Sequence, residues 1–327
     1  MGSRDHDFDI VYAGCTEGGF EVLRNLLSEG FDVTEVVTLT DGQAERHSVA
    51  GYYPLEGLAS EHDIPVYYPD RYSMDSTGAR DHFEDLGADL LIVNGWQRLV
   101  PEDVLGTFTR GGVGIHGSAY GLPKGRGRSP MNWTLIEGAR RFLLSVITLE
   151  AGVDSGKVLG TRKFDVNDYD TIRSMYYKLV IVTSDILVAK LPELLRGTAD
   201  LDEQVGGPTY YPKRTAKDGA IHWENTTTDV YNLVRAVSRP YPGAYTAAAG
   251  TTVMVWEAVP FSFDLSVDAE AGTVIAAFET TGDFIVKTGD GALLVTEWEA
   301  KDWTPEAGIV LDSLGERDRV DLEEHYD

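Results

Sequence analysis

A histidine inside a glycine-rich stretch is the first candidate for chemistry. His116 lies in "GIHGS", at the end of a strand-like apolar run, and Asp154 lies in the turn "AGVDSG" between two further strand-like segments. A carboxylate beside an imidazole orients the ring and favours its charged form, so the ring can donate to a developing oxyanion or accept a proton. If both face one cleft, the pair predicts proton handling. Taken singly, His116 is equally a packed or solvated side chain and Asp154 a turn residue.

Three cations follow the histidine in "PKGRGRSP", namely Lys124, Arg126 and Arg128. The glycines between them permit close backbone approach, and guanidinium groups make bidentate contacts with phosphate or carboxylate. The loop therefore predicts binding of an anionic substrate, and Ser118 is placed in the same substrate-binding set. The alternative is a basic surface loop that pairs with local acids.

The glycine-rich start "AGCTEGG" is the other candidate for phosphate binding. Its Gly14, Gly18 and Gly19 do not follow the G-x-G-x-x-G spacing of dinucleotide-binding folds. A tight turn is the better interpretation of these glycines, and an NAD site is the weaker one.

The elements that must position these residues alternate between strand and helix. Apolar, strand-like runs are separated by segments with helical spacing, so the pattern predicts an α/β fold, a Rossmann-like doubly wound and mostly parallel sheet with helices on both faces. Ligands of such sheets bind beyond the carboxyl ends of the strands, where "NGW" and "IHGS" both lie. The expected strands are 8–14, 31–39, 65–69, 88–96 and 110–118, and the expected helices between them 16–30 and 52–64.

The pattern of predicted elements changes near residue 205. Before it we expect a helix with Pro130 in its first turn, two strands over 142–166 and a long helix over 169–197. After it come a loop-rich linker, a short helix over 230–240, and short alternating strands typical of a small OB-like β-barrel. The predicted domains are 1–204, catalytic; 205–301, linker and β-barrel; and 302–327, an acidic tail.

The composition limits the setting of the protein. The formal net charge is −25 and only nine of the 28 basic residues are Lys, a balance that keeps a surface hydrated in concentrated salt and favours a halophilic cytoplasm. The rival interpretation is that the acidic surface repels nucleic acid. The single cysteine, Cys15, excludes an internal disulfide and a Cys-based zinc site. We find no membrane span and no apolar core of a signal peptide, and expect a cytoplasmic, soluble protein.

The stretch from Gly114 to Gly138, together with "AGVDSG", resembles the formyltransferases that use 10-formyltetrahydrofolate. The family includes methionyl-tRNA formyltransferase, sugar-nucleotide N-formyltransferases and glycinamide ribonucleotide formyltransferase. The resemblance spans nearly the whole chain, because "SVAGYYPLEGLASEHDIPVYYP" is similar to the second βα unit, and "YYPKRTAKDGAIHWENTTTDVYNLVRAVSRPYPGAYT" with "VMVWEA" is similar to the linker and C-terminal domain of some members.

The resemblance implies an enzyme whose catalytic set is Asn, His and Asp, without a metal. His116 and Asp154 match the last two, whereas Gly114 stands where the family has Asn, a donor to the formyl oxygen. Three explanations stay open: Asn94 supplies the amide, a backbone N–H or water replaces it, or the protein binds folate without catalysis. The expected residues around the 10-formyltetrahydrofolate co-substrate are Trp96, Leu99, Gly114, Glu150 and Gly152.

The acceptor follows less directly from the sequence. A methionyl-tRNA enzyme carries a basic loop after its second strand, but the matching segment "LTDGQAERHSVAGYYP" has one Arg and two acids. A nucleotide-linked amino sugar, with its diphosphate on the basic loop, is therefore the favoured acceptor. Transfer to methionyl-tRNA is the alternative.

Overall fold

The structure is a computed structural model that describes residues 8–264 and 267–314. In this part of the chain, two compact units form from segments that alternate along the sequence. The first contains residues 8–127, 142–164 and 176–209, and the second contains residues 128–141, 165–175 and those from 210 onward. The domain boundary near residue 205 stays a prediction. No helix in the described ranges is both long enough and apolar enough to cross a membrane.

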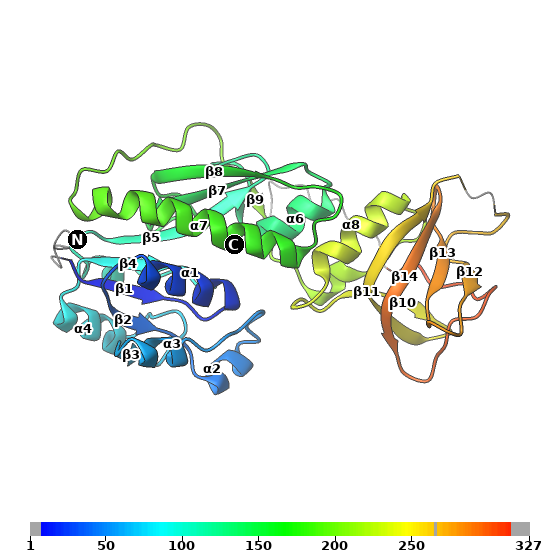
Figure 1. The fold of residues 1–327 in the computed structure, drawn as a ribbon, viewed down its shortest axis with the longest axis horizontal. Helices are drawn as coiled ribbons and strands as arrows, with labels where there is room; N and C mark the ends of the chain where they lie inside the picture. The colour runs from blue at the N-terminus through cyan, green and yellow to red at the C-terminus, as the bar shows by residue number, and fades with distance from the viewer. Residues whose placement is uncertain (1–7, 265–266, 315–327) are drawn as a thin grey trace. The chain divides into compact units, whose positions relative to one another are not determined.

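A seven-stranded sheet, with strand order β3-β2-β1-β4-β5-β7-β8, is the centre of the first unit (Figure 1). Its pairs β2/β3, β1/β2, β1/β4 and β4/β5 are parallel, and β5/β7 is antiparallel. The predicted mostly parallel α/β sheet is thereby confirmed. The strands are β1 (Ile10–Ala13), β2 (Val33–Val37), β3 (Val66–Tyr67), β4 (Leu90–Val93), β5 (Gly112–Ser118), β7 (Arg141–Thr148) and β8 (Val158–Asp165).

Helices cover both faces of this sheet. One hydrophobic cluster joins the sheet to α1 (Glu17–Ser28), α3 (Glu56–Glu61) and α7 (Ile172–Leu195). The other joins it to α2 (Asp41–Arg46), α4 (Thr77–Leu86) and α5 (Glu102–Leu105). Along β5, Val113 and Ile115 pack into the first cluster, so strand alternation turns position 114 and His116 toward the second.

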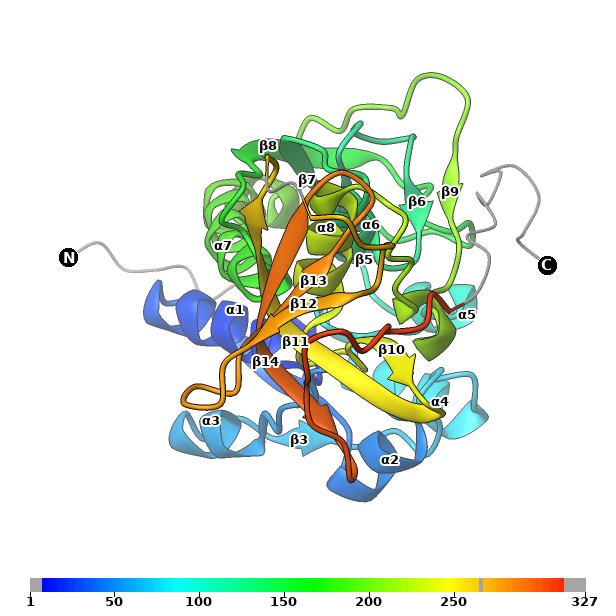
Figure 2. The same cartoon turned by 90° about the vertical axis from the view of Figure 1, so that its right-hand side faces the viewer.

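The second unit combines two helices with an antiparallel sheet (Figure 2). Its helices are α6 (Pro130–Ile136), with Pro130 in the first turn as predicted, and α8 (Thr227–Val237). Asn132 of α6 donates to the Ala236 carbonyl of α8 at 2.6 Å. The sheet has the order β10-β11-β14-β13-β12, with β10 (Ala244–Ala248), β11 (Thr251–Ser262), β12 (Val274–Ala277), β13 (Phe284–Lys287) and β14 (Ala292–Ala300). The two-residue strand β9 (Tyr210–Tyr211) and a 3₁₀ helix at Ala216–Gly219 also belong to the second unit, whereas the two-residue strand β6 (Arg126–Gly127) belongs to the first.

Residues 308–312 connect the two edges of this five-stranded sheet. Asp312 bridges to Ala247 of β10, and Val310 bridges to Thr273 next to β12, so the segment closes the sheet into the expected small barrel. The expected acidic tail therefore needs correction over this segment, because Leu311 is 1% exposed inside the barrel. The remainder of that tail, residues 315–327, lies outside the described residues.

Candidate active site

The structure brings His116 and Asp154 together. The Nδ1 atom of His116 lies 3.3 Å from Oδ2 of Asp154. His116 extends from β5 two residues beyond the last pairing of β5 with β4, at the carboxyl edge of the parallel strands, and Asp154 comes from the turn between β7 and β8. The predicted convergence of these two side chains is thus present, although they are 38 positions apart in the sequence.

The imidazole ring is held on its other side by the glycine-rich loop. The Nε2 atom of His116 is 2.8 Å from the carbonyl oxygen of Gly125, and the side chain is 7% exposed. Because a carbonyl oxygen only accepts, Nε2 carries the proton in this contact. Both ring nitrogens therefore face oxygen atoms, an arrangement that accommodates an imidazolium.

The turn that carries Asp154 has a restricted backbone. Asp154 has φ +49°, in the left-handed region that Asp tolerates better than most residues. Its Oδ2 atom accepts a hydrogen bond from the Gly127 amide at 2.8 Å. A side chain at Gly156 would overlap the Thr148 carbonyl, so the turn requires glycine there. The loop after His116 and the turn after β7 are thus joined at the carboxylate itself.

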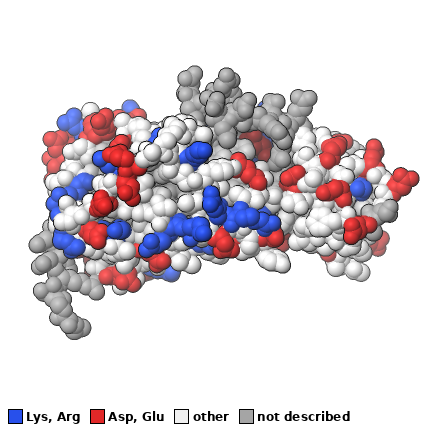
Figure 3. All heavy atoms as spheres, turned by 90° about the horizontal axis from the view of Figure 1, so that it is seen from above, with Lys and Arg blue, Asp and Glu red and all other residues white. Residues whose placement is uncertain are grey.

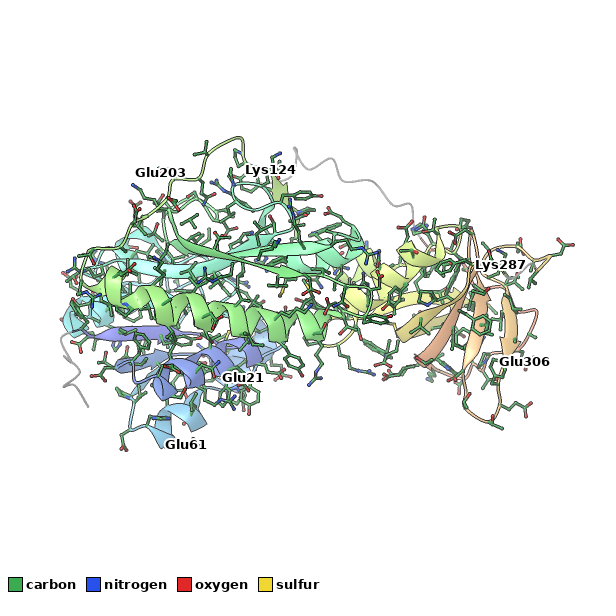
Figure 4. The ribbon with its side chains drawn as sticks, turned by 45° about the horizontal axis from the view of Figure 1, so that its top comes forward. Glu21, Glu61, Lys124, Glu203, Lys287 and Glu306 are labelled. Carbon is green, nitrogen blue, oxygen red and sulfur yellow. The ribbon has the colours of Figure 1, made fainter. Side chains whose placement is uncertain are left out.

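The three cations of the basic loop have different surroundings in the structure, whereas the sequence predicted one anion-binding set. Lys124 is exposed, and Figure 4 shows its side chain at the outer edge of the loop. The Arg126 guanidinium donates to Oε1 of Gln204 from Nε at 3.2 Å and from Nη2 at 2.8 Å. Arg128 belongs to the second compact unit. The loop therefore presents Lys124 to solvent, while Arg126 has a partner within the first unit.

Ser118 does not fit the predicted substrate-binding role. Its side chain is fully buried, and its hydroxyl donates to the Lys124 carbonyl at 2.6 Å. The same oxygen accepts from the amides of Tyr120 at 3.3 Å and Gly121 at 3.0 Å. We correct its assignment: Ser118 ties the glycine-rich loop back to β5.

Asn94 does not join the His116–Asp154 pair. Its Nδ2 atom donates to the Tyr12 hydroxyl at 3.1 Å, and that hydroxyl donates to the Gly19 carbonyl at 2.7 Å. Burial raises the pKa of Tyr12, so the phenol stays protonated. Tyr12 packs in the cluster under α1 and α7, on the sheet face opposite to His116. Asn94 as the missing oxyanion donor is therefore corrected to a buried strand-end side chain.

Leu149 fills the space next to Gly114. A β-carbon at Gly114 would lie 2.8 Å from Cδ2 of Leu149, which packs against the cluster on the same face as His116. The space that an Asn side chain at this position would enter is occupied by leucine. Gly114 is buried, and its folate contact stays a prediction. Sequence reasoning missed Leu149, since no motif marks a residue that fills a neighbour's space.

Besides Gly114 on β5, the residues expected around a folate lie on two segments of the first unit. Leu99 is 58% exposed in the segment after β4, whereas Trp96 is buried with its ring edge-on to Tyr72 at 4.8 Å between centroids. The Trp96 indole N–H has no hydrogen-bond partner among the described residues. Glu150 and Gly152 are exposed in the turn that leads to Asp154.

Charged residues of both signs share the surface. In the view of Figure 3, acidic side chains are scattered and Lys and Arg side chains form a band across the middle. Within residues 8–264 and 267–314, no group of three or more His, Cys, Asp or Glu side chains is arranged to hold a metal ion.

Comparisons with known proteins connect this geometry to a family. A family model described as "Formyl transferase" matches residues 13–191, and one described as "Formyl transferase, C-terminal domain" matches residues 213–306. The N-formyltransferase from Helicobacter canadensis, solved with folinic acid and dTDP-3-aminofucose, is 15% identical, with a TM-score of 0.65 over 89% of this chain and 99% of that one.

Two further solved structures share the fold. HypX from Aquifex aeolicus, solved with tetrahydrofolic acid, is 19% identical with a TM-score of 0.62, over 89% of this chain and 44% of HypX, so the chain spans less than half of that protein. Methionyl-tRNA formyltransferase from Clostridium thermocellum is 17% identical with a TM-score of 0.54, over 77% of this chain and 93% of that one. Because the first family model covers more than half of the 327 residues, the chain belongs to the formyl transferase family of enzymes.

Proposed function

We propose that the protein transfers a formyl group from 10-formyltetrahydrofolate to a primary amine, with His116 and Asp154 as the catalytic pair. The observation that carries the proposal is the 3.3 Å contact between these side chains at the carboxyl edge of the sheet, in a chain of the formyl transferase family. A non-catalytic folate-binding protein is the competing proposal, supported by Gly114 in place of the family's Asn.

The reaction needs a proton-handling group and a donor to the formyl oxygen. The amine nitrogen attacks the formyl carbon, the carbon–N10 bond breaks, and the proton lost by the amine passes to N10. Asp154 orients the ring through Nδ1, leaving Nε2 to donate to the oxyanion. Because Nε2 now contacts the Gly125 carbonyl at 2.8 Å, that carbonyl must give way when substrate binds.

In this proposal the folate binds to the segment that follows β4 and to the segment that precedes Asp154. Leu99 offers an exposed apolar surface for the pterin, and the unpartnered Trp96 N–H offers a buried donor. The solved complexes of the Helicobacter canadensis enzyme with folinic acid and of HypX with tetrahydrofolic acid support a folate as co-substrate.

The acidic composition supports a halophilic cytoplasm as the setting of the protein. This setting predicts that the Tm of the protein rises with the KCl concentration in the molar range.

A nucleotide-linked amino sugar is the favoured acceptor. The segment after β2 that would meet a tRNA contains Asp41, Glu45 and one Arg, and Asp41 already accepts a hydrogen bond from Tyr52 at 2.8 Å. Lys124 is exposed and available for a diphosphate. The complex of the Helicobacter canadensis enzyme with dTDP-3-aminofucose supports this choice, and the methionyl-tRNA enzyme of the same fold supports the alternative.

A two-part experiment tests the proposal. Purified protein is incubated with 10-formyltetrahydrofolate and a panel of nucleotide-linked amino sugars, or with charged initiator methionyl-tRNA, and products are identified by mass spectrometry. We expect a mass increase of one formyl group on an amino sugar. Formylated methionyl-tRNA alone would select the alternative acceptor. Calorimetric binding of folinic acid without any product would select the non-catalytic protein.

A further inference from the structure

Gln204 connects the two segments that hold the catalytic pair. Its Nε2 atom donates to the Asp154 carbonyl at 2.8 Å and to the Gly156 carbonyl at 2.7 Å, while its Oε1 atom accepts from Arg126. Both N–H groups of the amide are used, and its oxygen receives a guanidinium fork. One half-buried side chain therefore spans from the turn of Asp154 to the loop that follows His116.

The backbone around Gln204 is fixed on both sides. Upstream, Asp202 and Val158 exchange backbone hydrogen bonds of 2.9 and 2.8 Å at the start of β8. Downstream, the Thr209 hydroxyl accepts from the Gly125 amide at 2.9 Å, and the Thr209 carbonyl accepts from the Arg126 amide at 2.9 Å. Residues 202–209 are thus hydrogen-bonded to the start of β8 at one end and to the glycine-rich loop at the other. Gln204 lies between these two attachments.

The contacts of Gln204 affect the spacing between His116 and Asp154, on which the proposed chemistry depends. It holds the main chain of Asp154, a residue in the left-handed region, and the loop whose Gly125 carbonyl and Gly127 amide contact His116 and Asp154 respectively. Misplacement of a catalytic group by about 1 Å costs on the order of 100-fold in rate. Loss of the Gln204 contacts is therefore expected to lower turnover.

We propose that Gln204 is a positioning residue for the His116–Asp154 pair: its amide fixes the distance between the Asp154 turn and the glycine-rich loop. This inference rests on the proposed formyl transfer. Gln204 touches neither reacting group, and acts through the Asp154 carbonyl on one side and through Arg126 on the other.

The test replaces Gln204 by Met, which keeps the length of the side chain and removes its hydrogen bonds. The matched control is Glu203→Met, one residue earlier, where the side chain is exposed and forms an ion pair with the exposed Lys157 at 2.7 Å. We expect kcat of Gln204→Met to fall at least tenfold with KM for the formyl donor within threefold of the wild type, and Glu203→Met to keep the wild-type kcat.

A double-mutant cycle with Asp154→Asn separates positioning from loss of structure. If Gln204 acts through the pair, Gln204→Met lowers kcat at least tenfold in the wild type and less than twofold in Asp154→Asn. Equal losses in both backgrounds would overturn the proposal. If Gln204→Met does not fold, as judged by its Tm and by calorimetric binding of folinic acid, Gln204→Glu replaces it: this variant keeps an acceptor for Arg126 but loses both donors, and full activity in it would also overturn the proposal. An inactive wild type would instead refute the proposed function.

Discussion

Gly114 and Leu149 are coupled by space: a β-carbon on the glycine would lie 2.8 Å from Cδ2 of the leucine. The glycine is on β5, two residues before His116, and the leucine directly follows β7. A side chain at position 114 would therefore require Leu149 to move. In the proposed reaction the donor to the formyl oxygen is Nε2 of His116.

This relationship predicts the behaviour of Gly114→Asn. Overpacking a well-filled interior costs about 1–3 kcal/mol, so the variant should unfold at a lower urea concentration than the wild type. Leu149→Ala removes the obstructing atoms, and we expect the double variant to be less destabilised than the sum of the single variants. Urea unfolding followed by tryptophan fluorescence measures all four proteins.

Gly117→Ala is the control for this cycle. A β-carbon there would meet the Leu143 backbone and the Phe142 ring rather than Leu149. Its destabilisation should therefore be the same in the wild-type background as in the Leu149→Ala background. Strict additivity of Gly114→Asn and Leu149→Ala would show that the leucine is not what excludes a side chain from position 114.

The candidate site was partly accessible from the sequence. His116 and Asp154 each occur in a strand-end or turn motif, and the resemblance to the formyltransferases, added to that local pattern, predicted their meeting. Asn94 occurs in an equally suitable motif, but strand alternation carries its side chain to Tyr12 on the other face of the sheet. Gln204 has no local signal, because its partners lie 48 to 78 positions away and the segment around it has the composition of a linker.

The closing strand of the barrel provides a second prediction. Leu311 is 1% exposed and Val310 is 41% exposed, although both belong to the segment that bridges β10 and β12. Loss of a buried Leu side chain costs about 2–5 kcal/mol, whereas exposed substitutions stay within about 0.5 kcal/mol. We expect Leu311→Ala to lower the urea midpoint of the second unit and Val310→Ala to leave it unchanged.

Equal midpoints for these two variants would show that the segment does not close the barrel. Its sequence did not predict such a role, because two acidic flanks surround one short apolar run, a pattern shared with solvated tails. By contrast, β1 and β4 were predictable, since each is a continuous apolar run bounded by glycine or by polar residues. The helices α2 and α4 were not predicted, because α2 has only Ala44 as an apolar residue and α4 has three, Ala79, Phe83 and Leu86, within a polar sequence.

Cys15 gives the stability of the protein an alkaline dependence. Burial raises the pKa of this thiol to about 11, although hydrogen bonding to Tyr72 lowers it in part. The unfolded chain ionises first, so the contribution of the thiol to stability is complete below pH 9 and falls as the pH rises toward 11. The loss is on the order of 2 kcal/mol. We expect the free energy of unfolding to fall less between pH 8 and pH 10 in Cys15→Ala than in the wild type. Urea unfolding of both proteins at the two pH values measures this difference.

Parallel pH dependences of the two proteins would contradict this account of Cys15. Tyr12 is present in both proteins, whereas the pKa of Tyr72 is raised in part by Cys15, so the difference between the two proteins reports on the Cys15–Tyr72 pair. The same burial predicts that a maleimide reagent at pH 7 modifies Cys15 only after denaturation, since the side chain is inaccessible in the native protein.

The measurement that tests the central claim most directly is kcat of formyl transfer in Asp154→Asn beside Asp63→Asn. Both residues have left-handed backbone, with φ +49° and +56°, so Asn is tolerated equally at each, and Asp63 lies in the turn before β3. We predict that Asp154→Asn lowers kcat by about 10²- to 10⁴-fold and still binds folinic acid, while Asp63→Asn keeps the wild-type kcat. A wild-type kcat in Asp154→Asn would contradict a catalytic His116–Asp154 pair.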